Sequence, residues 1–147
     1  EIATEWIQAI ESLDRAFNAV IHRRFERALD EARALASGPL AGVRIVEIGA
    51  IGPAPYACMM LSDLGARVTR VDRIDPDPLA GAGDPRYDFL LRGRERIALD
   101  LKTERGRDIV LRLVDDADVL IDGFRPGVTE KLGIGPDACL ARNARLV

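Results

Sequence analysis

Few residues of this chain have the types and spacing that metal or nucleophile chemistry requires. The two cysteines, Cys58 and Cys139, stand far apart and form no CxxC pair, which excludes a zinc ribbon or a thioredoxin-like site. We expect both to be small buried thiols. The single histidine, His22, cannot form an HExxH site or a histidine cluster, and no serine stands in a GxSxG elbow. The residues therefore predict no metal site and no serine or thiol catalyst.

Arginine is the residue type that could bind a charged ligand. All but two of the 21 basic residues are arginine, the exceptions being Lys102 and Lys131. An arginine-rich segment could hold a polyanion such as a nucleotide diphosphate, because guanidinium groups form paired hydrogen bonds with phosphate. The residues alone favour another interpretation, a solvated charged face. Seven basic residues and four acids, a local charge of +3, lie between positions 86 and 107; the seven are Arg86, Arg92, Arg94, Arg96, Lys102, Arg105 and Arg107.

Two loops that follow predicted strands carry further candidates for ligand binding. Residues 49–55 read GAIGPAP, which lacks the GxGxxG spacing of a dinucleotide site and places prolines where amides would bind phosphate. The second predicted strand ends in Val71-Asp72-Arg73, where Asp72 could hold a ribose hydroxyl. The arginine beside it favours a phosphate instead.

The composition is that of an ordinary globular protein. The chain has 147 residues, 48% of them hydrophobic and 31% charged, with a net charge of -3, so it has room for one domain. The near balance of charges excludes a general nucleic-acid binder. No apolar run approaches the ~18 residues that a membrane span needs. The first residues lack the features of a signal peptide, and we expect a cytoplasmic protein without a membrane partner.

The first 36 residues have a helical period. Two amphipathic helices are predicted, the second at about 23–36, where Ser37-Gly38-Pro39 ends it. Their apolar stripes must pack against the rest of the chain or a partner, because two such helices alone are marginal in water. The residues expected to be buried are Trp6, Ile10, Leu13, Phe25, Leu29 and Leu35.

From Gly42 onward, strands and helices alternate. Strands are predicted at 43–48, 67–72, 96–101 and 118–122, and helices at 56–64, from Thr103, at 128–132 and at 136–142. Residues 145–147 look like the start of another strand, and residues 73–88 like a long exposed loop. This order predicts an α/β fold with a Rossmann-like, mostly parallel sheet preceded by the helical pair. The loops that follow the strands then meet at its carboxyl edge, where such sheets bind ligands.

Residues 38–147 resemble the N-terminal part of family III CoA-transferases, and most of all its alpha-methylacyl-CoA racemase branch. The resemblance is carried by the blocks GPAP, SDLGA, RGR, ALDLK, FRPGV and LG, in this order and spacing. It implies a Rossmann-like domain that holds coenzyme A or an acyl-CoA substrate, and a homodimer with interlocked chains.

The resemblance also assigns ligand contacts to six positions. Arg73 and Arg125 correspond to residues that contact CoA phosphates. Leu99, Asp100 and Lys102 correspond to the stretch that lines the adenine, partly through its backbone. Lys131 stands where related racemases often have arginine, which keeps the charge but loses the planar fork.

The catalytic residues of that family have no counterpart among these 147 residues. The resemblance puts its catalytic histidine and aspartate downstream of the strand that begins at Arg145. We therefore expect a truncated CoA-binding portion with no catalytic residue, inactive alone.

Residues 1–42 are similar to the N-terminal helical region of amidase signature enzymes, which also carry GPLAGV. The strand that follows here, VRIVEIGAI, lacks the catalytic lysine of those enzymes. This pattern predicts a chimera, with an amidase-like helical segment at 1–37 and the CoA-transferase/racemase domain at 38–147.

Four functions remain open from the sequence. The chain could be the CoA-binding front of an acyl-CoA racemase or transferase. It could be a free-standing module that binds CoA without chemistry. It could also be a fusion product with no ligand, or, less well supported, a fragment derived from an amidase.

Overall fold

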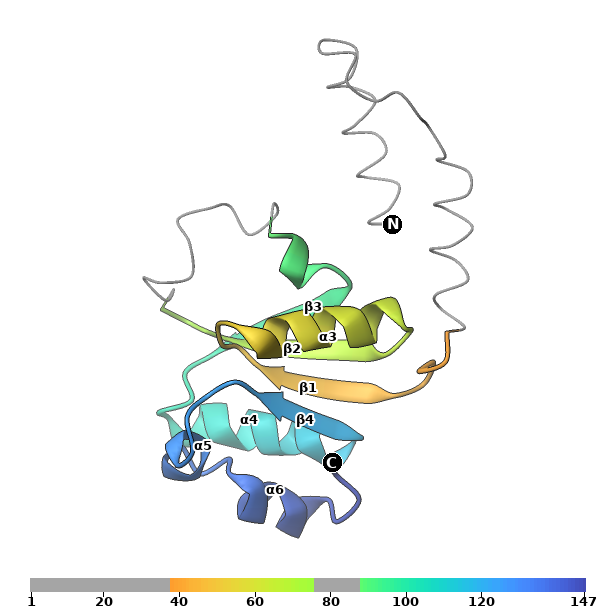
Figure 1. The fold of residues 1–147 in the computed structure, drawn as a ribbon. Helices are drawn as coiled ribbons and strands as arrows, with labels where there is room; N and C mark the ends of the chain where they lie inside the picture. Colours follow the sequence, from red (N-terminus) through yellow and green to blue (C-terminus); the bar gives the residue numbers. More distant parts are fainter. Residues whose placement is uncertain (1–37, 76–87) are drawn as a thin grey trace, which may run out of the picture.

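A four-stranded parallel sheet forms the centre of the molecule. The computed structural model describes residues 38–75 and 88–147 (Figure 1). The strands are β1 (Arg44–Ile48), β2 (Arg67–Arg73), β3 (Arg94–Leu99) and β4 (Val119–Asp122), in the spatial order β3-β2-β1-β4. All three neighbouring pairs are parallel, which confirms the predicted α/β class.

Helices cover both faces of this sheet. The helix α3 (Pro53–Asp63) connects β1 to β2 on one face, and the short 3-10 helix η2 (Phe89–Leu91) lies beside it. The helices α4 (Glu104–Asp115) and α6 (Pro136–Arg142) lie on the other face, and α5 (Val128–Lys131) follows β4 (Figure 1). This gives the three layers that a parallel sheet needs to bury both of its faces.

The alternation of side chains along β1 explains how two cores form. Ile45 packs with Cys58 of α3 in one apolar cluster, whereas Val46 and Ile48 join the cluster on the side of α4. Four of the five β1 residues are buried, as expected for a central strand.

Two elements begin earlier than the sequence predicted. The helix expected from Tyr56 begins at Pro53, because proline is well suited to the first helical turn. The strand expected at 96–101 runs from Arg94 to Leu99. The apolar pattern misled here, because Leu101 belongs to the core without being in the strand, and Arg94 is a strand residue with a buried side chain.

The structure assigns no strand to residues 145–147, where one was predicted to begin, and Arg145 lies in a turn, but Val147 makes one pair of bonds with β4. The Val147 amide donates to the Asp118 carbonyl (3.0 Å), and the Leu120 amide donates to the Val147 carbonyl (2.9 Å). This pair of bonds has the pattern of a parallel ladder along the outer edge of β4.

The predictions for the N-terminal helices, including the buried stripe from Trp6 to Leu35, lie outside the described residues. The same holds for most of the loop predicted at 73–88. Within 38–75 and 88–147, no helix has the length and apolarity that crossing a membrane would require.

Candidate functional site

The carboxyl ends of the four strands meet at one edge of the sheet. Ile48 of β1 lies opposite Val71 on one side and Asp122 on the other, and Arg73 lies opposite Leu99. The loops that the sequence singled out therefore leave the sheet at the same edge, as predicted.

Arg73 is the last residue of β2 and is exposed at this edge. It shares a face with Val71, which packs in the core on the side of α4. Its strand partner Leu99 is only 8% exposed, because the side chain belongs to that core. Only the backbone of Leu99 is therefore suited to contact a ligand.

Asp100 and Lys102 lie in the turn between β3 and α4. The Asp100 carboxylate accepts from the Lys102 amide (3.0 Å), and its carbonyl accepts from the Thr103 hydroxyl (2.7 Å). Thr103 in turn caps α4 by accepting from the Gly106 amide. A Cβ at Gly106 would lie 2.0 Å from the Asp100 carbonyl oxygen, so this turn requires glycine. Asp100 thus shapes the turn, and the Lys102 side chain is exposed.

Arg125 and Lys131 lie beyond the end of β4. Arg125 is exposed in the turn where the Val128 amide donates to the Arg125 carbonyl (3.2 Å), and Gly127 takes a positive φ of 86°. Lys131 is exposed at the end of α5. The structure thus brings Arg73, Leu99 and Asp100 together through neighbouring strands. Arg125 and Lys131 lie on the other side of β1.

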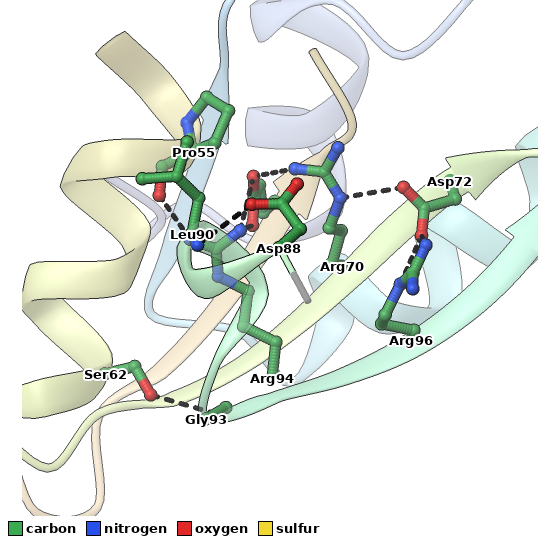
Figure 2. Close-up of polar contacts among 10 residues, drawn as sticks. Pro55, Ser62, Arg70, Asp72, Asp88, Leu90, Gly93, Arg94 and Arg96 are labelled. Atoms are coloured by element: carbon green, nitrogen blue, oxygen red, sulfur yellow. Dashed lines mark hydrogen bonds and ion pairs between the residues drawn. The ribbon is translucent and has the colours of Figure 1, made fainter. Parts of the chain in front are cut away.

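A buried network of charged side chains crosses the sheet beneath α3, and the sequence did not reveal it. Its centre is Glu47 of β1, which is fully buried. Arg70 of β2 and Arg94 of β3 both donate to its Oε1, the Arg94 Nη1 hydrogen bond being 3.2 Å long, and Arg94 Nη1 forms an ion pair with Oε2 at 2.9 Å. Figure 2 shows these two guanidinium groups converging from neighbouring strands.

The network continues towards the carboxyl edge through Asp72. Arg70 Nε donates to Asp72 Oδ1 (2.7 Å), and Arg96 Nε donates to Asp72 Oδ2 (2.7 Å; Figure 2). Asp72 is therefore held by two arginines, which speaks against its use as a ribose-binding acid.

Burial sets the electrostatics of the network. It raises the pKa of Glu47 above its ordinary value, while the charges of Arg70 and Arg94 oppose that rise. It also raises the pKa of the nearby Cys58 thiol to about 12. Cys58 and Cys139 are both buried, which confirms that prediction.

Three arginines of the basic segment have acidic partners. Arg92 pairs with Asp63, Arg94 with Glu47 and Arg96 with Asp72. The interpretation of this segment as a solvated face is therefore wrong for Arg94, whose side chain is 0% exposed, and these three arginines are not free for a polyanion. A glutamate in the middle of the apolar strand RIVEI was the one sequence signal that a buried charge needed a partner.

No group of three or more His, Cys, Asp or Glu side chains gathers as a cation site within the described part of the chain. The exposed side chains at the carboxyl edge include Arg73, Lys102 and Arg125, together with the carboxylates of Asp100 and Asp122. The positive side chains among them are suited to an anionic ligand.

Comparison with known proteins finds relatives of the part of the chain that forms the sheet and its carboxyl edge. The family described as CoA-transferase family III matches residues 40–147. Alpha-methylacyl-CoA racemase from Mus musculus is 42% identical over 108 residues, which cover 74% of this chain and 26% of the relative. A probable fatty acyl-CoA transferase, Rv3272 of Mycobacterium tuberculosis, is 38% identical over 118 residues, or 74% of this chain and 30% of the relative.

Solved structures agree with this relationship. A crystal structure of Rv3272 superposes with a TM-score of 0.66 at 35% identity, covering 75% of this chain and 32% of that one. A CAIB/BAIF family protein from Brucella suis gives 0.65 at 33% identity, covering 72% and 31%. The chain thus spans about a quarter to a third of the length of these relatives.

Residues 1–37 lie outside the family match, and their amidase-like character stays a prediction. From Leu40 to its last residue, the chain belongs to CoA-transferase family III.

Proposed function

We propose that residues 38–147 hold the phosphate-bearing end of coenzyme A or an acyl-CoA at the carboxyl edge of the sheet. One observation carries this proposal: Arg73 at the end of β2 and Arg125 after β4 are both exposed at that edge. Parallel sheets bind ligands there, and arginine suits phosphate. The family and the names of the relatives, an alpha-methylacyl-CoA racemase and a probable fatty acyl-CoA transferase, agree with a CoA thioester as the ligand.

The other ligand contacts follow from the same edge. The backbone of Leu99 and Asp100 would line the adenine, with the exposed stem of Lys102 beside it. Lys131 would add a positive charge near the end of α5. In the whole protein this portion would serve an acyl-CoA racemase or transferase, working as a homodimer with interlocked chains.

We assign no catalytic residue within the 147 residues. The carboxylates of Asp100 and Asp122 at this edge each accept from a backbone amide of their own turn, and the acid and base of the family are expected downstream. The proposed arrangement adds an amidase-like helical segment at 1–37 to the CoA-binding domain at 38–147.

Isothermal titration of the chain with CoA tests this proposal. Changing Arg73 or Arg125 to alanine should each weaken binding by roughly tenfold or more, since a hydrogen bond to a charged group contributes about 1.5–3 kcal/mol. The loss should shrink at high salt, because exposed charges are screened. The matched control is Arg112→Ala, an exposed arginine beside a hollow at the amino ends of the strands, which should bind CoA like the parent.

Dephospho-CoA separates the two arginines. Substituting the arginine that faces the 3′-phosphate should have no effect on binding of this analogue, whereas substituting the other should still weaken it. A parent chain that shows no saturable binding at about millimolar CoA would overturn the proposal in favour of a fusion product without a ligand.

A further inference from the structure

The tripeptide Arg92-Gly93-Arg94 at the start of β3 contacts α3 near both of its ends. Arg92 Nε donates to the Asp63 carboxylate (3.0 Å) in the last turn of α3. The Ser62 hydroxyl donates to the Gly93 carbonyl (2.9 Å; Figure 2). Arg94 Nη2 donates to the Pro55 carbonyl in the first turn (Figure 2). Three consecutive residues thus link β3 to the full length of a helix that lies between β1 and β2 in the sequence.

Gly93 allows this close approach. A Cβ at Gly93 would lie 2.3 Å from the Ser62 hydroxyl oxygen, and the backbone there has a φ of 72°, which favours glycine. The two arginines can therefore reach α3 on either side of Gly93, one towards each end.

The Arg94 contact differs from the Arg92 contact in burial. The Arg94 side chain is 0% exposed, and its Nε has no hydrogen-bond partner among the described residues. The Arg92 and Asp63 side chains are 40% and 39% exposed. A buried guanidinium left incompletely paired is costly, so stability alone does not explain why arginine stands at position 94.

Through the Pro55 carbonyl, Arg94 contacts the segment that leads from β1 into α3 at the carboxyl edge. Residues 49–55 comprise the loop after β1 and the first turn of α3, and the Gly49 amide donates to the Val71 carbonyl (2.8 Å) at one end of this segment. A Cβ at Gly49 would lie 2.9 Å from that same carbonyl oxygen, so the segment lies directly against β2. At its other end, the Pro55 carbonyl accepts from Arg94, whose orientation is fixed by the Glu47 carboxylate.

We infer that Arg94, held by Glu47, is a positioning residue that fixes the 49–55 segment at the carboxyl edge of the sheet. Arg92 and Asp63 hold the opposite end of α3 and do not affect this edge. The consequence for ligand affinity rests on the proposed function, but the effect on the segment itself does not.

Two matched double variants test the inference in the full chain. Glu47→Leu with Arg94→Met removes the buried pair, and Asp63→Leu with Arg92→Met removes the half-exposed pair. Replacing a buried ion pair with apolar residues of similar volume is often neutral for stability. Arg70 keeps Asp72 as its partner in the first variant.

Hydrogen exchange at two amides provides the structural measurement. The Gly49 amide reports on the 49–55 segment, and the Gly65 amide, which donates to the Ser62 carbonyl (2.9 Å), reports on the far end of α3. The first variant should speed exchange at Gly49 by about tenfold and leave Gly65 within roughly twofold. The second variant should do the reverse. Global destabilisation would instead speed both amides in both variants, and equal protection of Gly49 in the parent and the first variant would also overturn the inference.

CoA titration of the same variants gives the functional measurement. The first variant should bind CoA about tenfold more weakly, and the second like the parent; residues that support the ligands of a metal site contribute tenfold or more, and we expect the same order here. If the parent does not bind CoA, the proposed function fails while the exchange experiment still decides the role of Arg94. Should the first variant not fold, Arg94→Lys keeps the charge beside Glu47 without the fork, and must still speed exchange at Gly49 alone.

Discussion

Replacing Glu47 with glutamine removes the negative charge around which the buried network is arranged. The side chain keeps its size, but Arg94, with a side chain 0% exposed, loses its counter-charge, and Arg70, 11% exposed, keeps only Asp72. Breaking a buried pair by removing one partner costs about 3–5 kcal/mol, because a charge is left uncompensated. That is a large part of the ~5–15 kcal/mol by which a domain is stable.

Thermal and urea unfolding followed by circular dichroism measure this loss. For a chain of 147 residues, 1 kcal/mol shifts the Tm by roughly 3–4 °C, so Glu47→Gln should lower the Tm by roughly 10–20 °C. The control is Glu95→Gln. Glu95 also pairs with an arginine across two strands, Arg67 (2.9 Å), but these side chains are 58% and 70% exposed. An exposed pair contributes about 0–1 kcal/mol, so the control should shift the Tm by less than roughly 4 °C.

Comparing the Tm shifts of Glu47→Gln and Glu95→Gln also shows whether the Glu47 carboxyl is ionised. Burial raises its pKa, and a carboxyl that were neutral at pH 7 would be mimicked by glutamine at little cost. Equal, small shifts for Glu47→Gln and Glu95→Gln would therefore refute an ionised glutamate balanced by two arginines.

Three further predictions concern chemistry, packing and pH. The 147-residue chain alone should not exchange the alpha proton of a 2-methylacyl-CoA, because no acid and base pair is expected within it; deuterium uptake from heavy water above a control without protein would disprove this. Gly93→Ala should lower the free energy of unfolding in urea by at least ~1–2 kcal/mol, which is the cost of a left-handed alanine, and the clash with Ser62 should add to this loss. The double variant with Ser62→Ala should regain only the part of the loss that is due to the clash. The Arg142 guanidinium lowers the pKa of Asp115, so this carboxylate stabilises the fold above the ordinary aspartate pKa and loses that contribution as the pH falls through the lowered value. Asp115→Asn should therefore remove part of the pH dependence of the free energy of unfolding between these two pKa values. An acid-unfolding profile that stays unchanged in the variant would count against the pair.

Local patterns in the sequence determined the class of the fold. These patterns are the apolar strand RIVEI, the turns at glycine and proline, and the Thr103 cap of α4. Each depends on interactions between residues close in sequence, and together they predicted a parallel sheet with helices on its faces. The resemblance of residues 38–147 to family III CoA-transferases named the family, and the position of Arg73 at the end of β2 followed from the same local pattern.

Only the tertiary structure decided which charges are buried in pairs and which are exposed at the edge. Arg94 and Arg73 look alike in the sequence, yet one is buried against Glu47, 47 positions away, and the other is exposed at the carboxyl edge. The difference depends on the strand order β3-β2-β1, which places residues from three distant segments in one row beneath α3. Whether a charged residue can be buried depends on whether the fold gives it a partner of opposite charge. That partner is determined by which strands pair and in which register, and the local sequence pattern does not specify this.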